Sequence, residues 1–513
     1  MAKTANQILA EALTEVSEKA IGNIVHSKNV KPKQQALLVK NAYLKRIIKG
    51  WYLFDADLSA QKAGESALWF ESLWDFIGQY LTYRFADNYW LSAEASLDLH
   101  TENNAMPSQI VVFAKDGTES IIQLPNNMSL VTTRSKSKPD DLEKYHGVNV
   151  FPLETALVKS TPSSFKNNPV SMQVALTKAN FDILVEALIN SKNMASAGRL
   201  IGAYYALNMR AESKKLETIL TGVFGKIKVE NPFLVVPAML GDNRIEAASV
   251  DRIRILWQEM RQSIIDCFEN HEPDFDFYAR PLEDTLGMLS ELYVRDAYNS
   301  LSIEGYKVTP DLIKRVSSGN WSPETIEHDK EAKDALAARG YFDAFNCVKA
   351  SLAEAYNKED LKYLVDVGIT QWYTALFTPC VIAGLVREID IAGYRKGPIY
   401  IKRSRHVPPP SEQLLDCMTA LKECIVEEEL FTVKAILGHL FFGYIHPFFD
   451  GNGRTARFLM NFLFTLGGYQ WVVIELESRG KYLAALESAS VGKDITSFAA
   501  FILETIKRDK RKK

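Results

Sequence analysis

Cysteine is scarce in this 513-residue sequence, which contains only Cys267, Cys347, Cys380, Cys417 and Cys424, without CxxC spacing. This scarcity excludes a disulfide framework and a zinc knuckle, and it predicts buried, reduced thiols. Long hydrophobic runs are lacking as well: Ala375–Val386 is interrupted by Thr378 and Pro379 and is shorter than the roughly 18 residues that a membrane-spanning helix needs. The amino terminus lacks the basic-then-apolar pattern of an export signal, so we expect a cytoplasmic protein without membrane contact.

The overall composition is that of a globular chain with several domains. It has 60 basic and 63 acidic side chains, 47% hydrophobic residues, 27 glycines and 19 prolines. These values exclude collagen-like and wholly disordered proteins, and the length favours two to four domains. From about Asn180 onward helical periodicity dominates, and Val250–Glu269 places a stripe of large apolar residues on one side of a helix.

Acidic residues are absent from Ile21–Phe54, which carries seven cations. Pro32 stands where a helix could begin, and Gly50 interrupts a short apolar run typical of a hairpin, so we expect a helix-turn-helix with a wing. Two interpretations stay open: the basic face tracks DNA phosphates, or it is only a solvated face. The DNA-contact candidates are Lys33, Lys40, Lys45, Arg46 and Lys49.

The segment LVKNAYLKRIIKGWYLF, Leu38–Phe54, resembles the winged helix that opens abortive-infection antitoxins of the AbiEi type. Beyond it, β-branched runs at Gln109–Phe113 and Ser129–Thr133 predict a small mixed α/β domain. Ser92–His100 and Pro152–Leu157 are similar to the second domain of those antitoxins, which implies a nucleotidyltransferase-like fold. A paired-carboxylate metal signature is missing from this region, so we expect no catalysis there.

One segment, His446–Arg457, lies between two apolar helical runs and is expected to be a loop that ends at a helix amino terminus. Such a terminus presents unpaired N–H groups, and Gly451 and Gly453 let a phosphate approach the backbone. Arg454 and Arg457 are three residues apart, so they share one helix face and suit a polyphosphate.

Two further side chains of this loop suggest its chemistry. Asp450 is an oxygen ligand of the kind that Mg²⁺ on nucleotide phosphates requires. His446 has an imidazole that is neutral at cellular pH and able to accept a proton from a hydroxyl. The pattern therefore predicts metal-assisted transfer of part of a nucleotide to a hydroxyl.

The segment matches every fixed position of HxFx(D/E)GNGRxxR, the signature of the Fic family, so the chain resembles Fic proteins. That resemblance implies transfer of AMP from ATP to a Ser, Thr or Tyr hydroxyl of a target protein. It makes His446 the base and Asp450 the Mg²⁺ ligand. It also implies that the phosphates bind to Gly451, Asn452, Gly453, Arg454 and Arg457.

Weaker matches extend over about Val229–Ile506. Gly393–Pro410 looks like the family's β-hairpin flap, whose edge could align a target by strand addition. Ser300–Gly305 fits the family's inhibitory pattern (S/T)xxxE(G/N), which implies that Ser300, Glu304 and Gly305 form an inhibitory helix end. Glu304 would then pair with Arg457 and deny it to the γ-phosphate.

We therefore expect a multi-domain, mainly α protein with an all-helical Fic core and a small β-hairpin flap. The expected parts are a winged helix at 1–65, an α/β domain at 66–180, a helical connector at 181–228, a Fic region at 229–506 with its inhibitory helix near 293–305, and a basic tail at 507–513. The leading function is a self-inhibited protein adenylyltransferase. The alternatives are removal of AMP from a modified protein, or a DNA-binding toxin–antitoxin regulator with a latent Fic toxin; the target and the oligomeric state, a homo-oligomer included, stay open.

Overall fold

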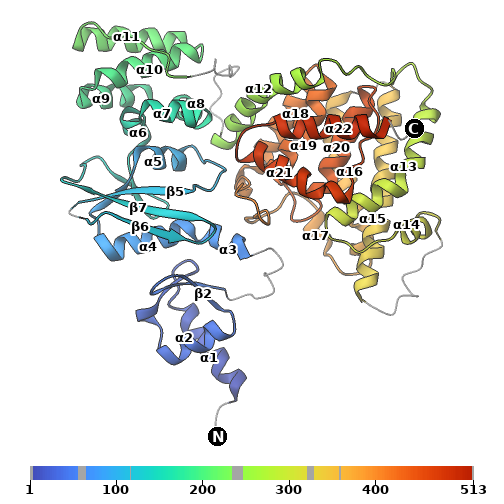
Figure 1. The fold of residues 1–513 in the computed structure, drawn as a ribbon, viewed down its shortest axis with the longest axis horizontal. Coiled ribbons are helices and arrows are strands. Elements are labelled where there is room, and N and C mark those ends of the chain that lie inside the picture. The colour runs from blue at the N-terminus through green and yellow to red at the C-terminus, as the bar shows by residue number, and fades with distance from the viewer. Residues whose placement is uncertain are drawn as a thin grey trace. The chain divides into compact units, whose positions relative to one another are not determined.

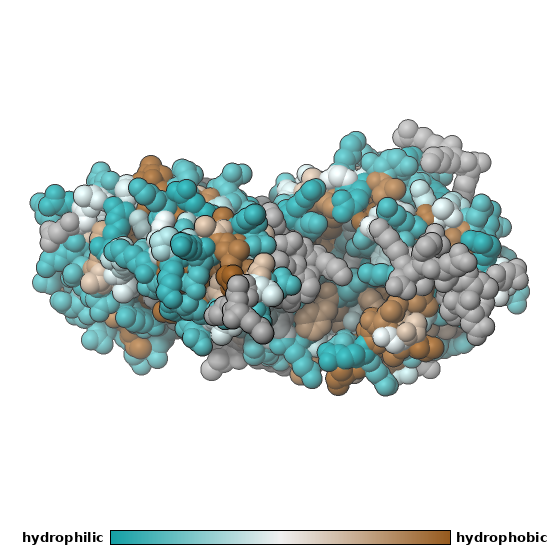
Figure 2. All heavy atoms as spheres, turned by 90° about the horizontal axis from the view of Figure 1, so that it is seen from below, coloured by the Kyte–Doolittle hydropathy of each residue, from teal (hydrophilic) through white to brown (hydrophobic). Residues whose placement is uncertain are grey.

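The computed structural model describes residues 4–55, 65–115, 117–233, 247–319, 329–357 and 360–510. The chain divides into two compact units, of which unit 1 comprises Met1–Ala248 with Tyr400–Val407, and unit 2 comprises Ser249–Ile399 with Pro408–Lys513. Among the described helices, none combines the length and the apolar character that a membrane span requires. Figure 2 shows hydrophilic side chains over most of the face that it draws.

Unit 1 begins with two helices and a three-stranded antiparallel sheet of order β1-β3-β2. Pro32 is the first residue of its helix, as expected, and the hairpin turns at Gly50, whose φ is +86°. The first strand of this hairpin starts at Leu44, so Lys45 and Arg46 lie in a strand. The elements are α1 (Ala5–Ser17), β1 (Ile24–His26), η1 (Ser27–Asn29), α2 (Pro32–Lys40), β2 (Leu44–Ile48) and β3 (Trp51–Phe54).

A mixed sheet follows in unit 1, with strand order β4-β5-β7-β6 and β5 parallel to β7. Alternate residues of β5 face opposite sides, so Ile110 and Val112 join a core with α4, while Phe113 packs on a second, helical core. In Figure 1, α4 and α5 lie on opposite faces of this sheet. The elements are α3 (Glu65–Glu71), α4 (Leu73–Phe85), β4 (Tyr89–Leu91), α5 (Ala93–His100), β5 (Gln109–Lys115), β6 (Ser120–Leu124), β7 (Met128–Ser135), β8 (Glu143–Tyr145) and β9 (Val148–Val150).

The rest of unit 1 is helical. Its apolar faces form the second core, which includes Phe165, Leu188 and Leu200. His100, on α5, bonds through Nε2 to the Phe151 carbonyl at 2.8 Å, so it is an ordinary partly buried histidine. The helices are α6 (Leu153–Lys159), α7 (Pro162–Asn167), α8 (Pro169–Lys178), α9 (Phe181–Ser191), α10 (Met194–Ala206) and α11 (Arg210–Phe224).

Unit 2 is a bundle of helices around α19 and α20 (Figure 1). The predicted stripe of the first long helix is buried, with Ile253, Trp257 and Ile264 at most 1% exposed. The five cysteines are free, and three of them are buried. The helices are α12 (Ala248–Phe268), α13 (Leu282–Ile303), α14 (Pro310–Ser317), α15 (Asp329–Tyr356), α16 (Leu361–Ile382), α17 (Glu388–Ile391), η4 (Ser411–Gln413), α18 (Leu414–Glu427), α19 (Phe431–Ile445), α20 (Asn452–Leu466), η5 (Leu476–Ser478), α21 (Arg479–Ser490) and α22 (Thr496–Lys510).

The expected hairpin at Gly393–Pro410 is not formed. These residues contain no strand, and Tyr400–Val407 belongs to unit 1. There the Met106 amide donates to the Arg405 carbonyl at 2.9 Å, and the Val407 amide donates to the Asn104 carbonyl at 2.7 Å. The backbone groups that a hairpin would pair with each other therefore bond to the chain at 104–106.

The expected basic tail is in part helical. Residues 507–510 form the last turn of α22, and residues 511–513 lie outside the described range.

Candidate active site

The loop between α19 and α20 is closed by its own side chains and backbone. His446 ends α19 in the left-handed conformation with φ 51°, and Gly451 begins α20 with φ 80°. A Cβ atom on Gly451 would lie 2.7 Å from the Phe377 ring, so glycine is required there. The Asn452 side chain accepts from the Phe448 amide at 3.0 Å and donates to the Phe448 carbonyl at 2.6 Å. Asn452 is among the predicted phosphate-binding residues; its side chain braces the loop, and its backbone belongs to the helix terminus, so its phosphate contact stays a prediction of the backbone N–H.

The His446 imidazole is held by the backbone of α19. Its Nδ1 atom lies 3.1 Å from the Gly443 carbonyl oxygen, which only accepts, so we assign the proton to Nδ1 and the lone pair to Nε2. Burial lowers the pKa of His446 to about 4. The imidazole is therefore neutral at pH 7, as the predicted role requires.

Arg395 holds the entrance of the loop, and sequence reasoning missed it. Its side chain is 3% exposed, and Nε donates to the His446 carbonyl at 2.9 Å. The Arg395 amide also donates to the Pro447 carbonyl at 2.8 Å. No local pattern marks this residue, because its partners in the loop lie about 50 positions further along the chain.

Arg454 is the first of two buried arginines near the start of α20. It is 1% exposed, lies 5.1 Å from the ring centres of Tyr306 and Phe377, and contacts Asp450 Oδ1 through Nη2 at 3.2 Å. Its Nε has no hydrogen-bond partner among the residues that the structure describes. A buried guanidinium with an unused donor fits an anion in the loop.

Arg457, the second arginine, is bound to the end of α13. Its Nε donates to Ser300 Oγ at 2.9 Å, and its Nη2 donates to the Ser300 carbonyl at 3.1 Å and to Glu304 Oε1 at 2.7 Å. Burial by itself lowers the pKa of Arg457, but the Glu304 carboxylate raises it, and the net shift is upward. Both partners were predicted from the pattern Ser300–Gly305, and the structure brings them together.

Gly453 makes room for this contact. A Cβ atom on Gly453 would lie 2.4 Å from Glu304 Oε1. The Glu304 carboxylate thus stands against the first turn of α20, where unpaired N–H groups attract negative charge. It occupies part of the site predicted for the phosphates, the helix terminus at Gly451, Asn452 and Gly453, which we call the anion cradle.

Gly305 is required by the end of α13. Its φ is +90°, and the bonds from Gly305 N to Ser302 O and from Tyr306 N to Leu301 O form a Schellman motif. Ser300 and Glu304 are four apart on the same face of the helix end, so both reach Arg457. The glycine of the pattern therefore ends the helix directly after the carboxylate.

Asp450 is the residue of the loop that was predicted to bind Mg²⁺. Its side chain is 63% exposed, and no group of three or more metal-ligating residues occurs within the described ranges. One exposed carboxylate beside an anion cradle fits a Mg²⁺ ion that is held mainly by nucleotide phosphates and water.

The predicted DNA-contact residues lie in the first part of unit 1. Lys33 and Lys40 are exposed on α2, Arg46 is exposed on β2, and Lys49 is exposed at the hairpin turn. Lys45 differs from them, because its Nζ pairs with Asp55 Oδ2 at 3.4 Å and is partly buried.

Unit 2 is thus a helical domain whose central helix pair carries a loop with a neutral imidazole and two buried guanidinium groups. The sequence model of the Fic/DOC family matches residues 359–464, so this part of the chain is a Fic domain.

Several curated proteins named protein adenylyltransferase Fic are similar to this chain. The chain is 26% identical to that of Nematostella vectensis over 227 residues, 43% of this chain and 48% of the relative. It is 30% identical to that of Aedes aegypti over 224 residues, 42% of this chain and 41% of the relative. The chain thus spans less than half the length of these relatives.

Solved structures give weaker similarity. Fic-1 (residues 134–508) of C. elegans is 16% identical with a TM-score of 0.38, covering 68% of this chain and 97% of that one. A Fic family protein of Desulfovibrio desulfuricans G20 is 22% identical with a TM-score of 0.36, covering 50% of this chain and 73% of that one.

Proposed function

We propose that the chain transfers AMP from ATP to a serine, threonine or tyrosine hydroxyl of a protein, its own chain included. The observation that carries this proposal is the loop His446–Arg457, which combines a neutral imidazole, a helix amino terminus and two buried guanidinium groups. The naming of the curated relatives agrees with it.

In the proposed reaction the hydroxyl oxygen bonds to the α-phosphorus, the bond from that phosphorus to the β-phosphoryl oxygen breaks, and pyrophosphate leaves. The hydroxyl proton passes to Nε2 of His446, which the Gly443 carbonyl leaves free by holding Nδ1. Arg454, Gly451 and Gly453 bind the phosphates and hold the α-phosphorus in line with the incoming hydroxyl.

Mg²⁺ would be bound by Asp450 together with phosphate oxygens, and it would neutralise charge on the leaving pyrophosphate. The exposure of Asp450 and the scarcity of other ligands suit an ion that arrives with the nucleotide.

The proposal is tested by incubating the protein with candidate targets and ATP labelled on either the α- or the γ-phosphate. We expect label on protein from the α-phosphate only, with a mass increase of one AMP. Label from the γ-phosphate would mean kinase activity and would overturn the proposal.

We further propose that Glu304 inhibits this reaction from within the chain. The γ-phosphate needs the guanidinium that Glu304 and Ser300 now hold, and ATP must then bind with its α-phosphate misplaced. A carboxylate facing a buried guanidinium competes well, because Arg457 has lost solvation that an opposite charge replaces.

The reverse reaction, removal of AMP from a modified protein, is a second candidate. The Glu304 carboxylate favours it, because this group is 30% exposed at the cradle and is able to position water. Glu304→Gly would then abolish AMP removal from a pre-modified target, whereas it would raise transfer if Glu304 only inhibits.

We also infer that the amino-terminal basic face binds duplex DNA, as a toxin–antitoxin regulator would require. Four exposed cations on α2 and the β2–β3 hairpin, within Ile21–Phe54, support this inference, since that range holds no carboxylate. A gel-shift titration of the full chain with the duplex DNA upstream of its own gene tests this inference.

A further inference from the structure

A pocket lies in unit 2, between α22 and the segment η5–α21. Its volume is about 360 Å³, and its lining includes Ser478, Lys481, Phe501, Glu504, Lys507 and Arg508. None of its lining residues belongs to the loop His446–Arg457. The volume is within the range of small-molecule sites and larger than one phosphate needs.

The pocket is positively charged. Lys481, Lys507 and Arg508 face a single acid, Glu504. Within the described part of the chain, the Nε and Nη2 atoms of Arg508 are shielded from solvent and have no hydrogen-bond partner, and Asp509 Oδ1 is 3.9 Å from Nε. These donors are available to an anion. A buried donor that bonds to neither protein nor water destabilises the fold, so an anion that accepts from it binds favourably.

One wall of the pocket is apolar. The half-buried ring of Phe501 lines it and lies 6.0 Å from the ring of Tyr482. A ligand with both a charged and an apolar part would use the cations and this ring together.

We propose that this pocket binds a small phosphate monoester with an apolar or aromatic body, and that binding strengthens the inhibition by Glu304. The regulatory half of this proposal rests on the proposed function; the binding half does not.

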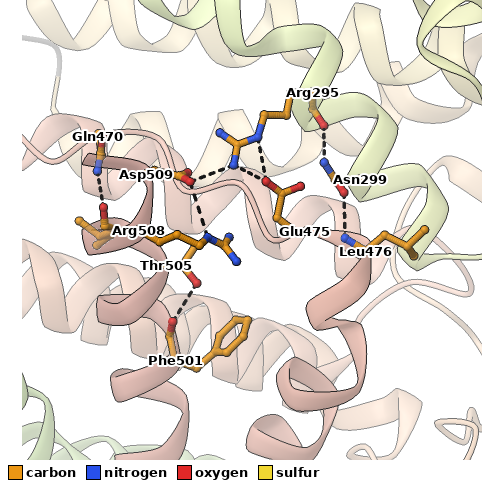
Figure 3. A network of polar contacts seen from close by, with 10 residues as sticks. Arg295, Asn299, Gln470, Glu475, Leu476, Phe501, Thr505, Arg508 and Asp509 are labelled. Atoms are coloured by element: carbon orange, nitrogen blue, oxygen red, sulfur yellow. Dashed lines mark hydrogen bonds and ion pairs between the residues drawn. The ribbon is translucent and has the colours of Figure 1, made fainter. Parts of the chain in front are cut away.

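The elements around the pocket hold the inhibitory helix α13 (Figure 3). Arg295 of α13 donates through Nη2 to Asp509 Oδ1 at 2.9 Å and through Nε to Glu475 Oε1 at 2.9 Å. Asp509 therefore lies between Arg295 of α13 and Arg508 of the pocket.

Two further bonds hold the half of α13 that ends at Glu304. Asn299 Oδ1 accepts from the Leu476 amide at 2.8 Å, and Arg479 Nε donates to the Ile303 carbonyl at 2.8 Å. Both partners flank Ser478, which lines the pocket.

The sign of the coupling follows from charge. While α13 is in place, Arg295 offsets one of the two negative charges of Glu475 and Asp509, and Asp509 Oδ1 lies 3.9 Å from Nε of Arg508. If α13 moves away, this positive charge is lost, so the nearby Glu475 and Asp509 carboxylates repel an anion more strongly, and Asp509 competes for Arg508. An anion thus binds the inhibited state more tightly, and by linkage it stabilises that state.

The binding half is tested by calorimetry of the full chain with phenyl phosphate in the absence of nucleotide. We expect the double change Lys507→Gln with Arg508→Gln to weaken binding on the order of tenfold or more, because charge-assisted bonds are lost. The isosteric change Glu504→Gln should strengthen binding instead. Lys510→Gln, on the same helix but outside the lining, is the control. Equal affinity in all four proteins, or no binding at millimolar concentration, overturns the proposal.

The regulatory half is tested by the rate of AMP transfer. Phenyl phosphate should slow transfer by the unmodified chain and leave Glu304→Gly unaffected, although calorimetry still detects binding to that variant. Slowing of both proteins would mean competition at the ATP site and would overturn this half. A chain that binds phenyl phosphate at the pocket but transfers no AMP under any condition would contradict the proposed function and leave the pocket intact.

Discussion

The cations of the loop His446–Arg457 and those of the basic face within Ile21–Phe54 differ in their exposure to water. Arg454 and Arg457 are 1% and 5% exposed, whereas Lys33, Lys40 and Arg46 are exposed. A buried guanidinium has lost its hydration and needs an anionic partner, so its environment indicates which kind of ligand it binds. An exposed lysine is satisfied by water alone, and its surroundings favour no particular partner. The comparison explains why the loop supports a specific reaction while the basic face supports only a class of partner.

The largest effect is expected from His446→Ala. Transfer should fall at least about 10²–10⁴-fold, because the general base is lost, while ATP binding is retained by the arginines and the helix terminus. Radiolabel transfer and calorimetry with ATP measure the two quantities. The exposed histidine variant His146→Ala is the control, and full activity of His446→Ala would remove the proposed base.

Release of Arg457 from Glu304 should give the next largest effect. Glu304→Gly should raise transfer about 5- to 150-fold, the usual size of one coupling between two states, because Arg457 becomes free for the γ-phosphate. Mass spectrometry of the chain and its targets measures the added AMP.

Two variants sharpen this second test. Arg457→Ala added to Glu304→Gly should cancel the gain, because the freed partner is missing. Glu291→Gly makes the same change at an exposed position of α13 and should leave transfer low. A gain in that control would show that loosening the helix, and not the loss of the carboxylate, activates the chain.

A smaller effect is expected at the basic face. DNA affinity of the full chain should fall steeply with salt, and each of Lys33→Ala, Lys40→Ala, Arg46→Ala and Lys49→Ala should reduce the salt slope by about one. Lys45→Ala should reduce it less, because Lys45 already pairs with Asp55. Fluorescence anisotropy at several salt concentrations measures the slopes, and salt-independent or absent binding would leave only a solvated face.

The smallest effect concerns stability and pH. Burial lowers the pKa of His439 to about 3 and that of His446 to about 4, so the unfolded chain takes up protons first as the pH falls. The stability that the two buried neutral histidines contribute is therefore complete above about pH 6.5 and is lost progressively as the pH falls below this value. Burial raises the pKa of Asp296 to about 6, which opposes this loss.

The net result should be a decrease of about 1 kcal/mol in the stability of the Fic domain between pH 6.5 and 5.5. Differential scanning calorimetry of the full chain measures it. His439→Gln should flatten the dependence, and a stability that rises over this interval would contradict the assignment.

Local structure was predictable where neighbouring residues decide it. Pro32 begins a helix, Gly50 turns a hairpin, and the apolar stripe of α12 is buried. The hairpin predicted at Gly393–Pro410 was wrong. Local sequence could not show this, because the backbone of Arg405 and Val407 bonds to residues 104 and 106, some 300 positions earlier. The similarity of the first domain to AbiEi antitoxins stays a prediction.

The sequence by itself determined the local form of the loop, because the glycines, the histidine and the two arginines of His446–Arg457 lie within one turn and one helix start. Only the tertiary structure decided how these groups are occupied. It set Glu304 against Arg457 across 153 positions, gave Asn452 a bracing role and lowered the pKa of His446. Such contacts and desolvation depend on which helices pack together, and local sequence does not encode that packing.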